Sequence, residues 1–244
     1  MPVRLLPSRR SLAVGLGLIA LAAGAYVVAR QTSTFALSRI EVTGAPPAIR
    51  AQVRRELAPL VGTSLLALDS SKLLRRVEAL PTVVSATYDR AFPHTLRLVV
   101  VPEQPVAILH SGSKTWLYSA RGRVVQPVPP RTYPGLPRIW VTAATPVAAG
   151  AFVQPDAAGA AARALALATR FPARVATAQL THGELVFTLR SGLELRFGAP
   201  TDLRLKLAVA RRALRLLPAG STYLDVSVAG RPVAGTNPQV SGRG

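Results

Sequence analysis

The side chains that could perform catalysis are few. Ser111 and Lys114 match the S-x-x-K pattern, in which a lysine activates a serine nucleophile, as in penicillin-binding enzymes. That chemistry needs the serine at the start of a buried helix and further S-D-N and K-T-G elements, whereas these two residues fall in a Gly/Ser turn before a predicted hairpin. The eleven acidic residues contain no close pair suited to two-carboxylate catalysis. We therefore predict that the chain is not an enzyme and has no catalytic residue.

Ligands for a metal or a cofactor are equally sparse. The three histidines, His94, His110 and His182, are far apart, lie near predicted turns and lack the short spacing of a metal-binding pair. The absence of cysteine excludes a disulfide scaffold, a thiolate zinc site, an iron–sulfur cluster and a cysteine nucleophile. No glycine-rich phosphate loop follows a predicted strand. We predict no metal, no cofactor and ordinary surface histidines.

The composition is that of a folded, strongly basic chain. Its 244 residues are 49% apolar and 17% charged, with a mean hydropathy of +0.30, which argues against a largely disordered protein. The formal net charge of +19 favours a polyanionic partner or reflects an arginine-rich genome, and both interpretations stay open. Phe187, Phe197 and Tyr223 are spaced as core or strand residues, not as a stacking platform among basic residues. We therefore predict no nucleic-acid partner.

An apolar run near the N-terminus predicts a membrane anchor. Residues 12–29 carry no charge, and as a helix they extend about 27 Å, close to the hydrocarbon thickness of a bilayer. Arg4, Arg9 and Arg10 precede the run, which places residues 1–11 in the cytoplasm and the bulk of the chain across the membrane. The large apolar residues predicted to span the membrane are Leu12, Leu16, Leu18, Ile19, Leu21, Val27 and Val28.

A cleaved export signal is the rival interpretation of this segment. Arg9 and Arg10 are similar to a twin-arginine signal, and Ala23-Gly24-Ala25 offers a cleavage site of the A-x-A kind. The apolar run nevertheless continues to Ala29, which is longer than a cleaved signal usually is. We favour an uncleaved, single-pass anchor in the cell membrane.

After a short tether at residues 30–37, the pattern predicts a small module of mixed structure. Pro46 and Pro47 suit the first turn of one helix, and Asp69 is a suitable cap for a second that ends at Pro81. Helices can cover only one face of so small a sheet, so an edge stays available at 38–43 or at 95–101. The predicted order of strand, helix, helix, strand, strand occupies residues 38–44, 46–62, 69–81, 83–89 and 95–101.

The rest of the chain predicts a β-rich module with two helices. Arg121-Gly122 and His182-Gly183 are predicted hairpin turns, and residues 127–137 hold five prolines and are predicted to be a loop. The last predicted strand, residues 222–229, alternates cleanly, whereas residues 231–244 are polar and rich in Gly and Pro, which favours disorder. The other elements are strands within 114–125, 175–181, 184–189 and 192–197 and helices at 156–170 and 201–217. The fold class is therefore α+β.

Several phrases resemble the POTRA domain and following strands of the FtsQ/DivIB family of bacterial division proteins. They are S-R-I-E-V-T-G from Ser38, the segment from Leu80 to Ala107, W-L-Y-S-A-R-G-R-V-V from Trp116, G-L-E-L-R-F-G from Gly192 and Y-L-D-V-S-V-A-G-R-P-V from Tyr223. Ser119 departs from the acidic residue that the family often has before the glycine turn. The resemblance implies six parts: a cytoplasmic tail at 1–11, a transmembrane helix at 12–29, a tether at 30–37, a POTRA domain at 38–105, a β-domain at 106–230 and a disordered tail at 231–244.

The resemblance also implies a function without catalysis. A protein of this family is a scaffold of the division septum that binds partners of the FtsB and FtsL types by adding a strand to a sheet edge, and that helps to assemble or control septal peptidoglycan synthesis. Carried over to this chain, the C-terminal edge strand that binds the partner is Tyr223, Leu224, Asp225, Val226, Ser227 and Val228. The resemblance further implies that the POTRA domain binds other division proteins. The alternatives are a POTRA-containing component of protein export or outer-membrane transport, an exported enzyme and a binder of wall polymers.

Overall fold

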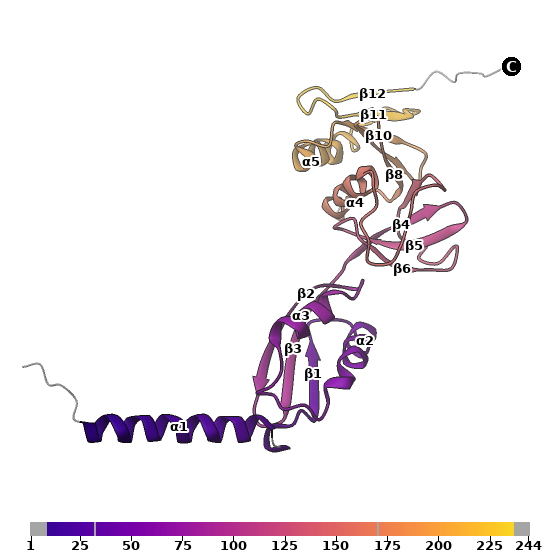
Figure 1. Ribbon diagram of the computed structural model, residues 1–244. Helices are drawn as coiled ribbons and strands as arrows, with labels where there is room; N and C mark the ends of the chain where they lie inside the picture. The colour runs from indigo at the N-terminus through magenta and orange to yellow at the C-terminus, as the bar shows by residue number, and fades with distance from the viewer. Residues whose placement is uncertain (1–8, 32, 170, 237–244) are drawn as a thin grey trace, which may run out of the picture. The chain divides into compact units, whose positions relative to one another are not determined.

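The computed structural model describes residues 9–31, 33–169 and 171–236 (Figure 1). Residues 1–8 of the predicted cytoplasmic tail and residues 237–244 of the predicted disordered tail lie outside the described residues. The chain divides into two compact units, residues 1–102 and 103–244. The expected boundary between the POTRA domain and the β-domain, after residue 105, lies three residues from this division.

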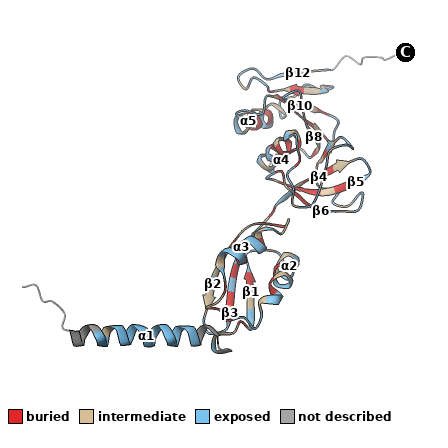
Figure 2. Cartoon of the chain, viewed as in Figure 1, coloured by how far each residue is buried: buried red, intermediate tan, exposed pale blue. Residues whose placement is uncertain are grey.

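The apolar N-terminal run forms a helix, α1 (Arg9–Gln31), whose described side chains are mostly exposed (Figure 2). Within the described part of the chain, however, no helix has both the length and the apolar character that crossing a membrane requires. The assignment of Leu16, Leu18, Ile19, Leu21, Val27 and Val28 to a membrane span stays a prediction, and the side chain of Leu12 lies outside the described residues.

A three-stranded sheet with two helices follows α1 and the short helix η1 (Ser33–Phe35). The sheet order is β1-β3-β2, with β1 parallel and β2 antiparallel to β3. The predicted element order is confirmed, but β3 is the central strand, so the edge that we expected at 95–101 does not exist. The elements are β1 (Arg39–Thr43), α2 (Pro47–Leu57), η2 (Ala58–Leu60), α3 (Ser70–Glu78), β2 (Val83–Ala91) and β3 (Thr95–Pro102).

Local signals and apolar stripes explain why these helices form here. Pro47 stands in the first turn of α2, where its missing N–H is not needed. The carboxylate of Asp69 accepts hydrogen bonds from the backbone N–H groups of Ser71 and Lys72 and caps α3. Both helices bury one stripe against the same face of the sheet. The fully buried members of this core include Val53, Leu57, Val77, Leu96 and Leu98.

The second unit is one nine-stranded sheet with two helices, α4 (Ala157–Leu167) and α5 (Leu203–Ala213), on one face. The strand order is β12-β11-β10-β9-β8-β7-β4-β5-β6. The helix α4 connects β7 to β8, which run parallel. The strands are β4 (Pro105–Ser111), β5 (Lys114–Ser119), β6 (Val124–Pro127), β7 (Arg138–Val141), β8 (Val175–Thr181), β9 (Glu184–Leu189), β10 (Glu194–Gly198), β11 (Tyr223–Asp225) and β12 (Val233–Gly235).

The large core of this unit lies between the sheet and its two helices. Phe187 and Phe197 meet edge to face with ring centroids 5.0 Å apart, and both are fully buried. A smaller cluster on the opposite face is made by Ile108, Leu117 and Val125, with Leu136 of the proline-rich loop packed against it. The predicted hairpin turn at His182-Gly183 is confirmed, because both residues have positive φ and join β8 to β9.

Candidate partner-binding edge

The C-terminal end of the large sheet differs from the prediction by one strand. Tyr223, Leu224 and Asp225 of β11 pair in parallel with β10, and they pair again, antiparallel, with Gly235, Ala234 and Val233 of β12. Both sides of β11 are therefore occupied within the chain, and the expected edge strand at 223–228 is wrong as an edge. In the described part of the chain, β12 is the outermost strand at this end of the sheet.

Residues after Asp225 leave the strand instead of extending it. The backbone N–H of Val226 still donates to the carbonyl of Arg196 at 2.8 Å, and its side chain is fully buried. The N–H of Ser227 then donates to the side chain of Asp225, which turns the chain away from the sheet, and Val228 is exposed. The chain reverses and returns as β12, so part of the predicted disordered tail is a strand.

On one face of this sheet end, Tyr223 is engaged by its own chain. The guanidinium of Arg196 lies 4.6 Å from the centroid of the tyrosine ring and also donates to the Glu194 carboxylate at 2.9 Å. The ring covers Gly235, where an added Cβ would lie 2.9 Å from the tyrosine oxygen. A side chain at position 235 would therefore displace the tyrosine ring, so a glycine fits best opposite Tyr223.

On the other face, an apolar groove of about 320 Å³ lies between α5 and the two end strands. Leu224 and Ala234, which are partners across β11 and β12, form its floor, and Ala213 and Leu217 belong to its opposite wall. Arg212 is the charged residue in its lining. The groove opens beside the outermost strand, so a strand added to β12 would place alternate side chains over it.

A buried lysine, Lys206, connects α5 to the end of β10 beside this groove. The ammonium of Lys206 donates to the carbonyls of Phe197 and Ala199 at 2.9 and 2.8 Å. These two carbonyls lie at and just after the end of β10, so the lysine ties the first turns of α5 to the strand that carries β11. Its methylene chain lies in the core while its ammonium group is paired with two carbonyl groups.

The candidate catalytic residues lie elsewhere and are not gathered into a site. Ser111 and Lys114 face each other across the β4–β5 hairpin, and the serine hydroxyl donates to the carbonyl of Thr142. His94 contacts the carbonyl of Ala36, and His110 stacks on an indole ring. Over the described residues, no group of three His, Asp or Glu side chains is placed to hold a metal ion. His182 occupies the β8–β9 turn.

The sheet of the first unit has edges of its own. Among the residues that the structure describes, β1 pairs only with β3, and Arg97 of β3 forms an ion pair with Glu41 on β1 at 3.1 Å. On the opposite edge strand, β2, the N–H of Ala86 donates to the carboxylate of Glu78, which blunts that edge. The edge predicted at 38–43 therefore exists as β1.

Sequence comparisons relate parts of this chain to known proteins. The family model described as "POTRA domain, FtsQ-type" matches residues 35–101, which covers β1 to β3 and both helices between them. The chain is also 27% identical, over 110 residues, to the "Cell division protein FtsQ" of Streptomyces venezuelae. That alignment covers 45% of this chain and 41% of the relative, so the chain spans about two fifths of the curated relative that it matches. Residues 35–101 are thus an FtsQ-type POTRA domain, and the predicted resemblance of the chain to the FtsQ/DivIB family of cell-division proteins is confirmed.

Proposed function

We propose that this chain is a non-enzymatic scaffold of the bacterial division machinery that binds a partner by strand addition at β12. The observation that carries the proposal is the combination of an outermost strand with an adjoining apolar groove at the same end of the sheet. An edge strand offers backbone N–H and C=O groups in a row, and a groove beside it selects the side chains of the added strand. The FtsQ-type POTRA domain favours this role over protein export.

The residues around β12 indicate which side chains the partner strand should carry. Alternate residues of the added strand face the groove of Leu224 and Ala234, so these positions of the partner are apolar. The charged residue in the lining of the groove is Arg212, which is exposed. Acidic residues next to the partner's apolar positions match this charge and speed the encounter. A partner of the FtsB type, held in a coiled coil with one of the FtsL type, fits the role that the resemblance implies.

The scaffold role follows from two binding units on one chain. In the proposal, β12 holds the FtsB-type partner, and the POTRA domain binds other division proteins through its open β1 edge. Neither contact requires chemistry. Bringing the partners together at the septum is how the chain would help to assemble or restrain septal peptidoglycan synthesis.

Two truncations of the otherwise full-length chain decide which strand receives the partner. A chain ending at Gly230 lacks β12, whereas a chain ending at Thr236 keeps it and serves as the matched control. We expect co-expressed FtsB-type protein from the same organism to be captured by the longer chain and not by the shorter one. Capture by the shorter chain at equal or greater yield would show that the partner replaces β12 and pairs with Tyr223–Asp225 instead.

Filling the groove tests whether side chains of the partner strand bind in it. Ala213→Phe places a ring in the groove, and Leu205→Phe places one on an exposed position of the same helix that does not line it. The first variant should weaken capture at least tenfold while the second leaves it unchanged. Equal capture by both variants would mean that the groove takes no part in binding.

A further inference from the structure

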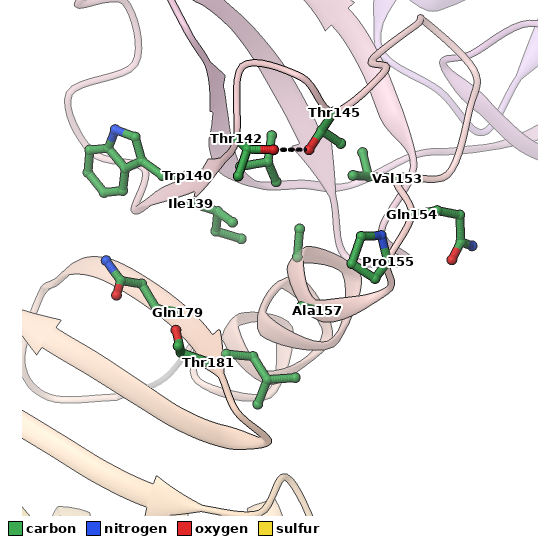
Figure 3. Close-up of a pocket in the computed structure, with 13 residues that line it drawn as sticks. Ile139, Trp140, Thr142, Thr145, Val153, Gln154, Pro155, Ala157, Gln179 and Thr181 are labelled. Atoms are coloured by element: carbon green, nitrogen blue, oxygen red, sulfur yellow. Dashed lines mark hydrogen bonds between the residues drawn. The ribbon is translucent and has the colours of Figure 1, made fainter.

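A second cavity lies in the middle of the large sheet, where two parallel strands part. β7 pairs with β4 over four successive residues, but β7 and β8 share only one register pair, Arg138 with Thr177. Beyond that pair the strands diverge around a crevice of about 480 Å³ (Figure 3). The crevice is lined by the ends of β7 and β8, the connection from β7 to α4 and the first residues of α4. It shares no lining residue with the groove beside β12.

The position of the crevice is one where ligands bind in sheets with parallel strands. It lies at the carboxyl ends of β7 and β8 and next to the first turn of α4, at Ala157 and Ala158. Within the described residues, no backbone pairing joins β7 and β8 past Arg138 and Thr177. Both walls are therefore strand edges that face a cavity, and they suit a ligand group that both donates and accepts hydrogen bonds as a peptide group does.

The crevice is lined by apolar side chains and by uncharged polar ones. Thr142 and Thr145 are hydrogen-bonded to each other through their hydroxyls at 2.8 Å, and Gln179 and Thr181 are exposed at the end of β8. No Asp, Glu, Lys, Arg or His is among the lining residues, although the chain carries a net charge of +19. A charged ligand would gain no ion pair here, so the lining selects a neutral ligand with hydroxyl or amide groups.

An aromatic ring stands at the rim. Trp140 is 48% exposed and stacks on His110 with ring centroids 5.1 Å apart and planes inclined by 20°. Burial, and secondarily the charge of Arg138, lowers the pKa of His110. Figure 3 shows Trp140 and Gln179 together at one side of the pocket, with Val153, Gln154 and Pro155 at the other. A supported, half-exposed indole presents the kind of surface on which the C–H face of a sugar ring packs.

We propose that this crevice binds a neutral glycan that contains N-acetylated sugar units. The acetamido group supplies one N–H and one C=O for the two strand edges, and its methyl group contacts Ile139 and Val153. The sugar ring packs on Trp140, and its hydroxyls pair with Gln179 and Thr181. The division scaffold would then bind a polysaccharide with one part of its β-domain and a protein with another.

Fluorescence tests this site directly because the chain has two tryptophans, Trp116 and Trp140. In the full-length Trp116→Phe variant, Trp140 is the sole indole. We expect a saturable change in its emission on titration with the tetramer of β-1,4-linked N-acetylglucosamine. The tetramer of β-1,4-linked glucose, which lacks the acetamido group, should bind at least tenfold more weakly.

Variants that keep the fold locate the contact. Gln179→Ala should weaken binding of the N-acetylglucosamine tetramer at least fivefold by titration calorimetry, whereas Gln126→Ala, on the exposed edge strand β6, should leave it unchanged. No saturation, equal binding of the two tetramers or an unaffected Gln179→Ala variant would overturn the proposal. Tighter binding of a neutral extended peptide such as acetyl-Ala-Thr-Ala-Thr-amide would overturn it as well, and would show that the crevice takes a peptide strand.

Discussion

The two sheets of this chain differ in how they end. In the POTRA domain, β1, β3 and β2 have five, eight and nine residues, and both helices cover the same compact core. In the β-domain, the strands shorten toward the C-terminus, from six residues in β9 to five in β10 and three in each of β11 and β12. The first sheet ends on strands that belong to its core, and the second ends on strands held mainly by a few contacts.

Because of this difference, the strands that would bind a partner are not the strands on which the stability of the β-domain depends. A short terminal strand with few buried side chains opens at a lower free energy than a core strand, without unfolding the domain. Val226 and Leu224 are the fully or nearly fully buried residues at this end, whereas Val233 on β12 is 53% exposed. We infer that the β-domain core fixes β10, that α5 and Lys206 position β11, and that β12 is the adjustable strand. A docking edge gains from that arrangement because it can adapt without cost to the core.

The sharpest test of the comparison is to remove one core side chain from each unit. Leu98→Ala in the POTRA core and Phe187→Ala in the β-domain core should each cost about 3–5 kcal/mol of unfolding free energy. Both tryptophans lie in the β-domain, so the denaturant transition followed by tryptophan emission reports that unit alone. Phe187→Ala should shift this transition, and Leu98→Ala should shift only the POTRA part of the circular dichroism signal.

The contrary result has a clear meaning. If tryptophan emission and circular dichroism shift together in Leu98→Ala, the two units unfold as one cooperative structure. The comparison of separate sheets would then fail. Wild-type protein, measured by both probes at the same concentration, is the reference for each shift.

A next, smaller effect is expected at two glycines with the same backbone conformation. Gly122 and Gly183 have φ near +80°, but an added Cβ meets the Cα of Gly159 at 2.9 Å in the first case and nothing within 4 Å in the second. Gly122→Ala should therefore cost about 2–4 kcal/mol, and Gly183→Ala about 1–2 kcal/mol from conformation alone. Urea denaturation followed by tryptophan emission measures both. Equal costs would show that the turn does not press on α4.

Local signals in the sequence predicted most of the elements correctly. Pro47, the cap at Asp69 and the turn at His182-Gly183 act within a few residues, so the helices of the POTRA domain and the hairpin of β8 and β9 were readable. The strand β7 was missed because its four residues follow a loop of five prolines and form a strand only by pairing with β4. That pairing joins residues about thirty positions apart, which no local pattern records.

The prediction placed the partner-binding edge on residues 223–228, whereas the outermost described strand is the next one, β12. Clean alternation over residues 222–229 predicted a long edge strand, but Asp225 bonds to the N–H of Ser227 and ends it early. The Gly and Pro content of residues 231–244 predicted disorder, so the short strand Val233–Gly235 was not predicted. Tyr223 and Gly235, a large ring and a residue without a side chain, fit opposite each other across β11 and β12. Such complementarity is visible only once the register is known.

The support of β11 by Lys206 should give an effect of intermediate size. Lys206→Met keeps the buried methylene volume but leaves the carbonyls of Phe197 and Ala199 without their donor, which should cost about 1–3 kcal/mol. Lys72→Met removes a lysine that is exposed and pairs only with Asp69 at 3.8 Å, and should change stability by less than about 0.5 kcal/mol. Denaturant titration compares the two. Similar losses in both variants would argue that Lys206 does not tie α5 to β10.

The smallest change in unfolding free energy is expected for Arg196, and its effect should be confined to the neighbouring strands. Arg97 of the POTRA sheet serves as the comparison. Arg196→Met removes the cation over Tyr223 and the pair with Glu194, and should lower unfolding free energy by only about 0.5–1 kcal/mol. Hydrogen exchange at the amides of β11 and β12 should nevertheless accelerate several-fold, because these strands depend on that contact. Arg97→Met, which breaks the exposed pair with Glu41 on β1, should leave exchange in the POTRA sheet unchanged because its core holds that strand. Faster exchange in β1 but not in β12 would reverse the assignment of which sheet end is held by its core and which by surface contacts.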